Sequence, residues 1–217
     1  MTRLATALLA LVCATASLAQ PIPYPYASRE QALKGLSAPE AVQRVEAITW
    51  IANHGTQADG EALARRLSDK HPMVRSFAEQ GLWRLWHRSG DPAIDALMTR
   101  GAQQMEERRL DAAIATYSEV IRRKPAFAEG WNRRATARFL AGEYRQSLAD
   151  CDEVMKRNPL HFGALSGYGQ IYFELKRYDK AIEYWRRALE VNPNMSGVES
   201  NLERAEKLLA ERRRRMI

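Results

Sequence analysis

The chain has 217 residues, two cysteines and a formal net charge of +7. No stretch shows convincing alternation of polar and apolar residues, which excludes the nucleotide-binding sheet folds. Removal of residues 1–19, expected below, takes Arg3 and Cys13 away. The remaining charge is then +6 (7 − 1), and Cys151 has no partner for an internal disulfide.

Residues 1–19 have the pattern of a secretory signal. Arg3 supplies a short positive region, Leu4–Val12 is an apolar run, and small residues lead to a cleavage site after Ala19. The run is too short to span a bilayer as a permanent helix. Lipid attachment is the alternative, but Cys13 lacks the small residue that should precede it. We therefore expect an exported protein, periplasmic or secreted.

Residues 20–27 form a proline-rich lead, in which Pro21, Pro23 and Pro25 alternate with Ile22 and two tyrosines. Proline lacks the backbone N–H that a helix needs, so an extended segment is expected. This segment is either a plain spacer or lies along the folded body.

A helical pattern returns over residues 28–93, without the period of the later repeats. It predicts four helices, near Glu30–Gly35, Pro39–Asn53, Gly60–Ser68 and Pro72–Trp86. The prolines at 39 and 72 suit a first helical turn, where the missing N–H has no partner to lose.

This region also shows a weak internal repeat. A shift of 31 residues (75 − 44) aligns Arg44 with Arg75 and Ala47 with Ala78. The run that begins at Asp69, with the pattern Asp-x-x-Pro-x-Val-Arg, resembles a HEAT-type repeat. The resemblance implies stacked helical hairpins over residues 28–93.

The stretch Ile94–Met195 consists of three copies of one 34-residue unit, which are Ile94–Phe127, Ala128–His161 and Phe162–Met195. Each unit has a small residue at its eighth place, a large residue at its seventeenth and a proline near its end. These residues are Gly101, Ala135 and Gly169, then Leu110, Tyr144 and Tyr178, then Pro125, Pro159 and Pro193. The small residue lets two helices approach, and the proline stops the second helix. Each unit is therefore a helical hairpin that must stack on its neighbours to bury its apolar side.

The spacing and residue types resemble the tetratricopeptide repeat (TPR). The third copy matches most closely, through Gly169, Tyr172, Tyr178, Ala181, Trp185, Ala188 and Pro193. The resemblance covers about half of the chain and implies an all-α, right-handed α-solenoid that acts as a binding scaffold and not as an enzyme. Trp185 and Tyr178 should be buried between hairpins. Cys151 takes the place of Trp185 in the second unit, so we expect it to be a packing residue.

Two further features complete the solenoid. Residues 91–105 should close the HEAT-like region and open the TPR units, so that both arrays share a core there. Residues 196–217 predict a capping helix and basic tail, with an apolar stripe of Val198, Leu202, Ala205, Leu208 and Leu209.

The TPR resemblance implies a concave groove lined by the second, fifth, ninth and twelfth places of each unit. These are Asp95, Met98, Ala102 and Met105, then Glu129, Asn132, Thr136 and Phe139, then Gly163, Ser166, Gln170 and Phe173. We predict that the partner-binding residues among them are Met98, Met105, Asn132, Thr136, Phe139, Ser166, Gln170 and Phe173. They combine apolar anchors with amide and hydroxyl groups suited to a peptide. The alternative is a solvated helix face without a ligand.

TPR domains that grip a C-terminal carboxylate use lysine and arginine at such places. Among the groove positions of this chain, only Asn132 is a residue type found in such clamps, so a clamp for chaperone tails is not supported. No catalytic, cofactor or metal site is predicted either. The four histidines have no cysteine or carboxylate at metal-ligand spacing; they are His54, His71, His87 and His161.

Basic clusters offer a second interpretation. They include Arg133, Arg134, Arg138 and Arg212–Arg215, which could attach the protein to anionic envelope lipid or polymer. Acidic neighbours such as Glu129 favour solvated helix faces instead, and nucleic acid is not expected as a partner. The sequence therefore predicts an exported protein-protein interaction scaffold that binds a peptide or protein partner in the TPR groove, with envelope attachment as the alternative.

Overall fold

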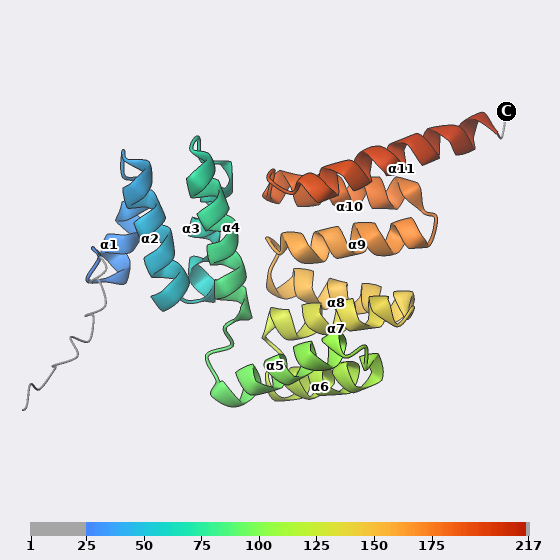
Figure 1. Cartoon of the computed structure of the whole chain (residues 1–217), viewed down its shortest axis with the longest axis horizontal. Helices are drawn as coiled ribbons and strands as arrows, with labels where there is room; N and C mark the ends of the chain where they lie inside the picture. The colour runs from blue at the N-terminus through green and yellow to red at the C-terminus, as the bar shows by residue number, and fades with distance from the viewer. Residues whose placement is uncertain (1–24, 216–217) are drawn as a thin grey trace, which may run out of the picture.

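The computed structural model describes residues 25–215. In that range the chain forms eleven α-helices and two short 3-10 helices without any strand, so the predicted all-α class is confirmed (Figure 1). The predicted signal at 1–19 and residues 20–24 of the lead lie outside the described residues. None of the helices between residues 25 and 215 is long and apolar enough to cross a membrane.

Four helices precede the repeats, which are α1 Arg29–Gly35, α2 Ala41–His54, α3 Gly60–Ala64 and α4 Pro72–His87. Pro72 lies in the first turn of α4, as expected. Pro39 instead precedes Glu40, the N-cap of α2. The helix predicted over residues 60–68 is split, because the chain tightens after α3 into the 3-10 helix Arg65–Ser68.

The core of these N-terminal helices lies between α2 and α4. Ile48, Ile51 and Leu82 are fully buried there. Arg44 of α2 makes a bidentate ion pair with Asp69, with Nε–Oδ2 and Nη2–Oδ1 distances of 2.9 and 2.8 Å. The Asp69 run singled out in the sequence thus ties the turn before α4 back to α2. Its HEAT-like assignment stays a prediction.

Three helical hairpins follow, which are α5 Pro92–Glu106 with α6 Leu110–Arg123, α7 Ala128–Leu140 with α8 Tyr144–Arg157, and α9 Phe162–Glu174 with α10 Tyr178–Val191. In each hairpin a small residue of the first helix lies near a fixed place in the second; the pairs are Gly101 with Tyr117, Ala135 with Cys151, and Gly169 with Trp185. A Cβ atom on Gly101 or Gly169 would overlap the aromatic ring, so these two close approaches require glycine.

The buried aromatic residues of the third hairpin were predicted with partial success. Trp185 is 1% exposed, as expected. Tyr178 is only partly buried and packs against Phe173 of its own hairpin, with ring centroids 5.4 Å apart. The residue at the seventeenth place therefore closes the end of a hairpin and does not enter the core between hairpins.

The last helix, α11 Ser196–Arg214, covers the third hairpin (Figure 1). Val198 and Ala205 are buried in the cluster that includes Trp185, with Leu202 and Leu209 partly buried beside them. Without α11, the apolar side of α10 would face solvent, as at the end of any repeat array. α11 therefore closes the stack at its C-terminal end.

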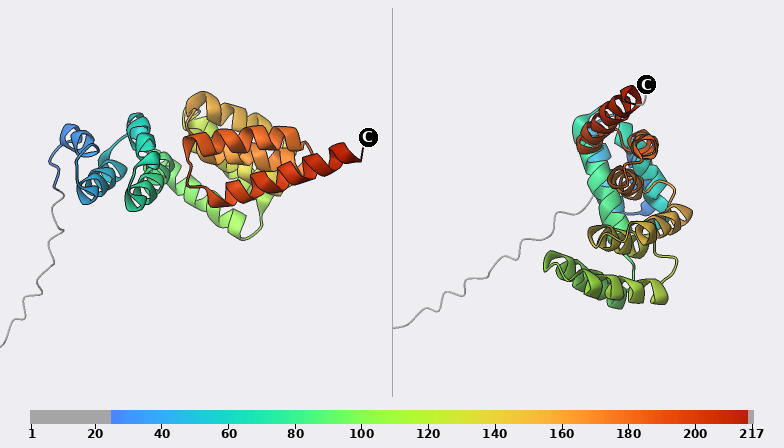
Figure 2. Two further views of the ribbon diagram at one scale, coloured as in Figure 1. Left: turned by 90° about the horizontal axis from the view of Figure 1, so that it is seen from above. Right: turned by 90° about the vertical axis from the view of Figure 1, so that its right-hand side faces the viewer.

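The N-terminal helices lie across the side of the repeat stack and do not continue it. In Figure 1, α4 stands at the left ends of the repeat helices, and Figure 2 shows the two parts side by side in a second view. Phe162, at the start of α9, is fully buried in the core of the N-terminal helices. Its ring centroid lies 5.2 Å from that of Trp83 and 5.0 Å from that of Trp86, both on α4.

The prediction that the HEAT-like region and the TPR units share a core at residues 91–105 is therefore wrong. Ile94 is 2% exposed, but it packs with Val120 and Phe127 inside the repeats. The reason is that α4 ends at His87 and non-helical residues lead away to α5. The aromatic face of α4 meets the later turn before α9 instead.

Candidate functional site

A cavity of about 260 Å³ opens between α7 and α9, and α8 contributes to its wall. Five of the eight predicted partner-binding residues line it, which are Asn132, Thr136, Phe139, Ser166 and Gln170. Ala135, Cys151 and Ile171 supply apolar wall, and Ser147, Gly163, Ala164 and Gly167 complete it with small side chains. The structure therefore brings the predicted residues of the second and third units together.

Hydrogen bonds inside the chain orient the polar groups of this cavity. Asn132 Nδ2 donates to Glu129 Oε2 at 3.0 Å, and Thr136 Oγ1 donates to the backbone carbonyl of Asn132 at 3.0 Å. Gln170 Nε2 donates to Glu174 Oε1 at 3.0 Å. The side-chain oxygens of Asn132 and Gln170 are thus left as acceptors for the N–H groups of a ligand backbone.

The cavity exists because the second unit has a small side chain where the others have an aromatic ring. Cys151 takes the place of Tyr117 and Trp185, which fill their hairpins. Cys151 is 2% exposed, and burial raises the pKa of its thiol above the ordinary value. The thiol therefore stays protonated and forms part of the wall, without nucleophilic character.

The two methionines predicted as groove residues are not among the residues that line this cavity. Met98 and Met105 pack around Tyr117 in the first hairpin. The Tyr117 hydroxyl donates a weak hydrogen bond to Met105 Sδ at 3.6 Å. Both methionines therefore serve the packing of the first unit.

Phe139 and Phe173 occupy the same place in their units but have different surroundings. Phe139 lines the cavity and packs against Tyr144, with ring centroids 5.7 Å apart. Phe173 packs against Trp185 at 5.6 Å and lies under the guanidinium of Arg204 from α11. Phe139 is therefore the phenylalanine that the cavity presents.

The residue at the second place of each unit contacts the N-terminal part of the chain. Asp95 Oδ1 accepts a hydrogen bond from the backbone of Ser89 at 3.0 Å. Glu129 Oε1 lies 3.1 Å from His87 Nε2, and Gly163 lies directly against an indole ring of α4. Asp95 and Glu129 were expected in an open groove, and for these two residues that expectation is wrong. Gly163 also lines the cavity between α7 and α9, and on α7 the open part begins at the fifth place.

Glu129 is the buried centre of a polar cluster with Arg133, His87 and His161, called here the Glu129 cluster. Arg133 Nε donates to Glu129 Oε1 at 2.7 Å, and His161 Nε2 lies 3.0 Å from Glu129 Oε2. Burial alone would raise the pKa of Glu129, but the hydrogen bond from His161 and the nearby positive charges hold that pKa well below its usual range. Trp86 stacks on His161 with ring centroids 4.5 Å apart. The cluster therefore joins α4, α7 and the turn before α9.

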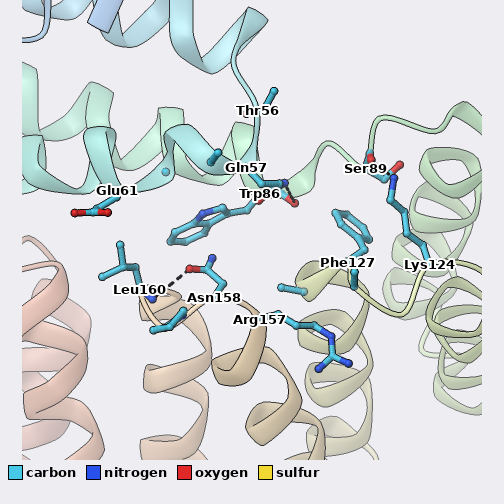
Figure 3. Close-up of a pocket in the computed structure, with 15 residues that line it drawn as sticks. Thr56, Gln57, Glu61, Trp86, Ser89, Lys124, Phe127, Arg157, Asn158 and Leu160 are labelled. Carbon is cyan, nitrogen blue, oxygen red and sulfur yellow. Dashed lines mark hydrogen bonds between the residues drawn. The ribbon is translucent and has the colours of Figure 1, made fainter.

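A larger cavity of about 530 Å³ lies where α4 meets the turns before α7 and α9 (Figure 3). The Trp86 indole extends into it from α4, towards Asn158. Lys124 Nζ donates to the backbone carbonyl of Ser89 at 2.5 Å, and Gln57 Nε2 donates to a backbone carbonyl of α4 at 2.7 Å. The Lys124 bond joins the repeats to the segment after α4, and the Gln57 bond lies within the N-terminal helices.

The Glu129 cluster was missed by sequence reasoning. Glu129 and Arg133 are four residues apart, which is the spacing of an ordinary solvated helix pair. One signal was present in the sequence, because Trp83, Trp86 and His87 place three aromatic rings close together on α4. In the described part of the chain, no three His, Cys, Asp or Glu side chains are placed to hold a metal ion.

Two family models match the repeat region. Both describe the tetratricopeptide repeat, and they cover residues 100–154 and 164–195. A TPR repeat-containing protein of Rhizobium etli is 40% identical over 108 residues, which are 50% of this chain and 53% of that protein. Hsp70-Hsp90 organizing protein 1 of Glycine max is 28% identical over 105 residues, 48% of this chain and 18% of that protein. The chain thus spans about half of the first relative and less than a fifth of the second.

Solved structures share the fold of the repeat region. The TPR domain of Sgt2 from Aspergillus fumigatus is similar with a TM-score of 0.55 and 23% identity, over 57% of this chain and 83% of that chain. The first TPR of Spaghetti (RPAP3), bound to the HSP90 peptide SRMEEVD, is similar with a TM-score of 0.52 and 24% identity, over 54% and 93%. The stacked hairpins of this chain are therefore tetratricopeptide repeats, as their 34-residue spacing predicted.

Proposed function

We propose that the chain is a protein-interaction scaffold whose cavity between α7 and α9 takes one apolar side chain of a peptide or protein partner. The observation that carries this proposal is the meeting of five predicted residues around one cavity with an apolar wall and a polar rim. Apolar anchors supply most of the affinity of a bound peptide, and polar groups fix the direction of its backbone.

Related structures support a peptide as the class of ligand. One similar TPR domain holds an HSP90 peptide, and the TPR2B domain of yeast Sti1 is described in a complex with pHsp70. The lining of the cavity here contains no lysine or arginine. Because an acidic tail needs such cations, we propose an uncharged apolar anchor for this chain.

The test introduces larger side chains at Gly167, which lines the cavity. A Cβ atom on Gly167 would meet only Cys151 Sγ, at 3.9 Å, which is ordinary contact. Gly167→Ala and Gly167→Leu should therefore fold while they remove space in steps. Against peptides selected on the wild-type protein from a phage-displayed library, Gly167→Leu should weaken binding about tenfold or more, since a buried apolar side chain contributes about 1.5–3 kcal/mol.

Gly197→Ala is the matched control. Gly197 also lies in a helix, α11, and a Cβ atom there would have no neighbour within 4 Å. The affinity of Gly197→Ala for the selected peptides should equal that of the wild-type protein. Full affinity in Gly167→Leu, or selected peptides that share no apolar residue, would refute the cavity as the binding site.

We also propose that the scaffold acts outside the cytoplasm. The support is the signal pattern of residues 1–19. N-terminal sequencing of the protein from a periplasmic or culture fraction should begin at Gln20. An intact Met1 on protein found only in the cytosolic fraction would refute export.

A second candidate function is attachment to an anionic envelope surface. The observation that favours it is a depression of about 500 Å³ lined by Lys176, Arg177, Arg212 and Arg215, between the α9–α10 turn and the end of α11. Binding to vesicles of anionic lipid should then fall steeply with added salt and with deletion of residues 212–217. Peptide binding that survives both changes would favour the cavity between α7 and α9.

A further inference from the structure

His87 ends α4 and faces the repeat stack at the Glu129 cluster. Its Nδ1 lies 2.6 Å from the backbone carbonyl oxygen of Trp83. A carbonyl oxygen can only accept, so Nδ1 must carry a hydrogen in this arrangement. The other ring nitrogen, Nε2, is therefore the one that can gain or lose a proton.

Two groups of opposite hydrogen-bonding character compete for His87 Nε2. Glu129 Oε1 lies 3.1 Å away, and a carboxylate can only accept. Arg133 Nη2 is also within hydrogen-bond reach of Nε2, and a guanidinium can only donate. With a hydrogen, Nε2 donates to Glu129. Without one, it accepts from Arg133.

His161 has no such choice of partner. Its Nδ1 accepts from the backbone N–H of Ala164 at 3.1 Å, and its Nε2 faces Glu129 Oε2 at 3.0 Å. These two contacts assign the neutral tautomer with the hydrogen on Nε2. His87 is therefore the histidine of the Glu129 cluster that can change charge and keep its other hydrogen bond.

We propose that His87 is a proton switch at the contact between α4 and the repeat stack, in which the protonated imidazole binds Glu129 and the neutral imidazole binds Arg133. When His87 is protonated, the two cations repel each other and the Arg133 guanidinium moves away. The guanidinium can move towards solvent because the Arg133 side chain is 33% exposed. When His87 is neutral, Arg133 bridges Glu129 and His87.

The other charged groups near His87 do not take part in this exchange. On α4, Arg84 donates to the side chain of Asn53, and Arg88 donates to backbone carbonyls at the end of α2. On α6, burial raises the pKa of Tyr117 to about 12, so this hydroxyl stays neutral. The groups that face His87 from α7 and from the turn before α9 are Glu129, Arg133 and His161.

The switch makes the contact tighter on the acid side of neutrality. A hydrogen bond from an imidazolium to a carboxylate is charge-assisted and therefore stronger than its neutral counterpart. It forms only in the folded chain, so its contribution to stability is present when His87 is protonated. That contribution is lost as the pH rises and His87 gives up its proton. The switch does not depend on peptide binding between α7 and α9.

Nitrogen NMR of the full chain tests the exchange of partners directly. Uniform ¹⁵N labelling distinguishes protonated from unprotonated ring nitrogens, and His87→Gln assigns the His87 signals. We expect Nε2 of His87 to carry a hydrogen at the acid end of a pH series and to lose it at the alkaline end, with Nδ1 protonated throughout. An Nε2 that does not change over this range would overturn the switch.

Two variants separate a switch from a passive histidine. Arg133→Gln removes both the competing donor and the repelling charge, so His87 should stay protonated to a higher pH; an unchanged midpoint contradicts the exchange. His87→Gln should lower the melting temperature by a few degrees more at about pH 5.5 than at about pH 8.5. His54→Gln is the matched control, because His54 ends α2 and its Nδ1 lies 3.0 Å from the carbonyl of Trp50. An equal loss in His87→Gln at both pH values would also overturn the proposal.

Discussion

The second and third repeat units have the same backbone plan but fill their hairpins differently. In the third unit, Gly169 lets Trp185 lie against α9, where the indole Nε1 donates to the carbonyl of Ser166 at 3.2 Å. In the second unit, Ala135 stands in the place of the glycine and Cys151 in that of the tryptophan. The space left beside Cys151 is the cavity between α7 and α9.

This difference teaches that one unit of an array can be specialised while its neighbours hold the stack together. A small side chain in a closed core leaves a destabilising void. Here the void is bordered by polar residues, so a ligand can fill it. The units on either side keep their complete pairs, which are Gly101 with Tyr117 and Gly169 with Trp185.

The largest expected effect is the loss of the third-unit indole. Trp185→Ala removes a side chain that is 1% exposed and should lower the free energy of unfolding by about 3–5 kcal/mol. Cys151→Ala, the equivalent change in the second unit, should lower it by only about 1 kcal/mol because fewer atoms are lost. Urea unfolding followed by circular dichroism measures both. Equal losses would show that the two units do not differ as described.

A smaller effect is expected from two glycines that lie two residues apart on α9. Gly169→Ala forces a Cβ atom into the Trp185 indole and should lower the free energy of unfolding by about 1–3 kcal/mol. Gly167→Ala points to the cavity and should raise that free energy by about 0.5–1 kcal/mol, through the better helix propensity of alanine. Urea unfolding measures the free energy of both variants. If both substitutions change the free energy of unfolding in the same direction, the distinction between a filled third hairpin and an open second hairpin is wrong.

The smallest effect concerns the loss of stability in acid. It depends on Glu129 of the second unit, whose place in the third unit is taken by Gly163. The pKa of Glu129 is lowered to about 2 in the folded chain, against about 4.3 for free glutamate. The carboxylate therefore contributes stability that is complete above the unfolded value and is lost as the pH falls from about 5 towards 2. The melting temperature should drop over that window. Glu129→Gln should flatten the drop, and an equally steep drop in this variant would argue against the Glu129 cluster.

The parts of the fold that depend on local periodicity could be predicted from the sequence. The 34-residue register and its resemblance to the tetratricopeptide repeat predicted that Trp185 is buried between hairpins. The burial of Trp185 is confirmed. The same register led to Asn132 and Gln170, which the structure places at one cavity.

The parts that depend on contacts between distant segments could not be predicted. Phe139 and Phe173 have the same place in their units, but α11 contributes Arg204 to only one of them. Likewise, α4 crosses the side of the stack because Trp83 and Trp86 meet Phe162. No periodic pattern connects residues so far apart, and the buried state of Glu129 follows from this crossing.

The position of α4 also sets the width of the proposed binding surface. Because His87 of α4 contacts Glu129, the open surface of α7 runs from Asn132 to Phe139. The seven residue-to-residue steps from Asn132 to Phe139 span about 10 Å, which is about the diameter of one α-helix with its side chains. A single extended or helical segment has that width, so under the proposed function the wall formed by α4 would leave room for one ligand chain at a time.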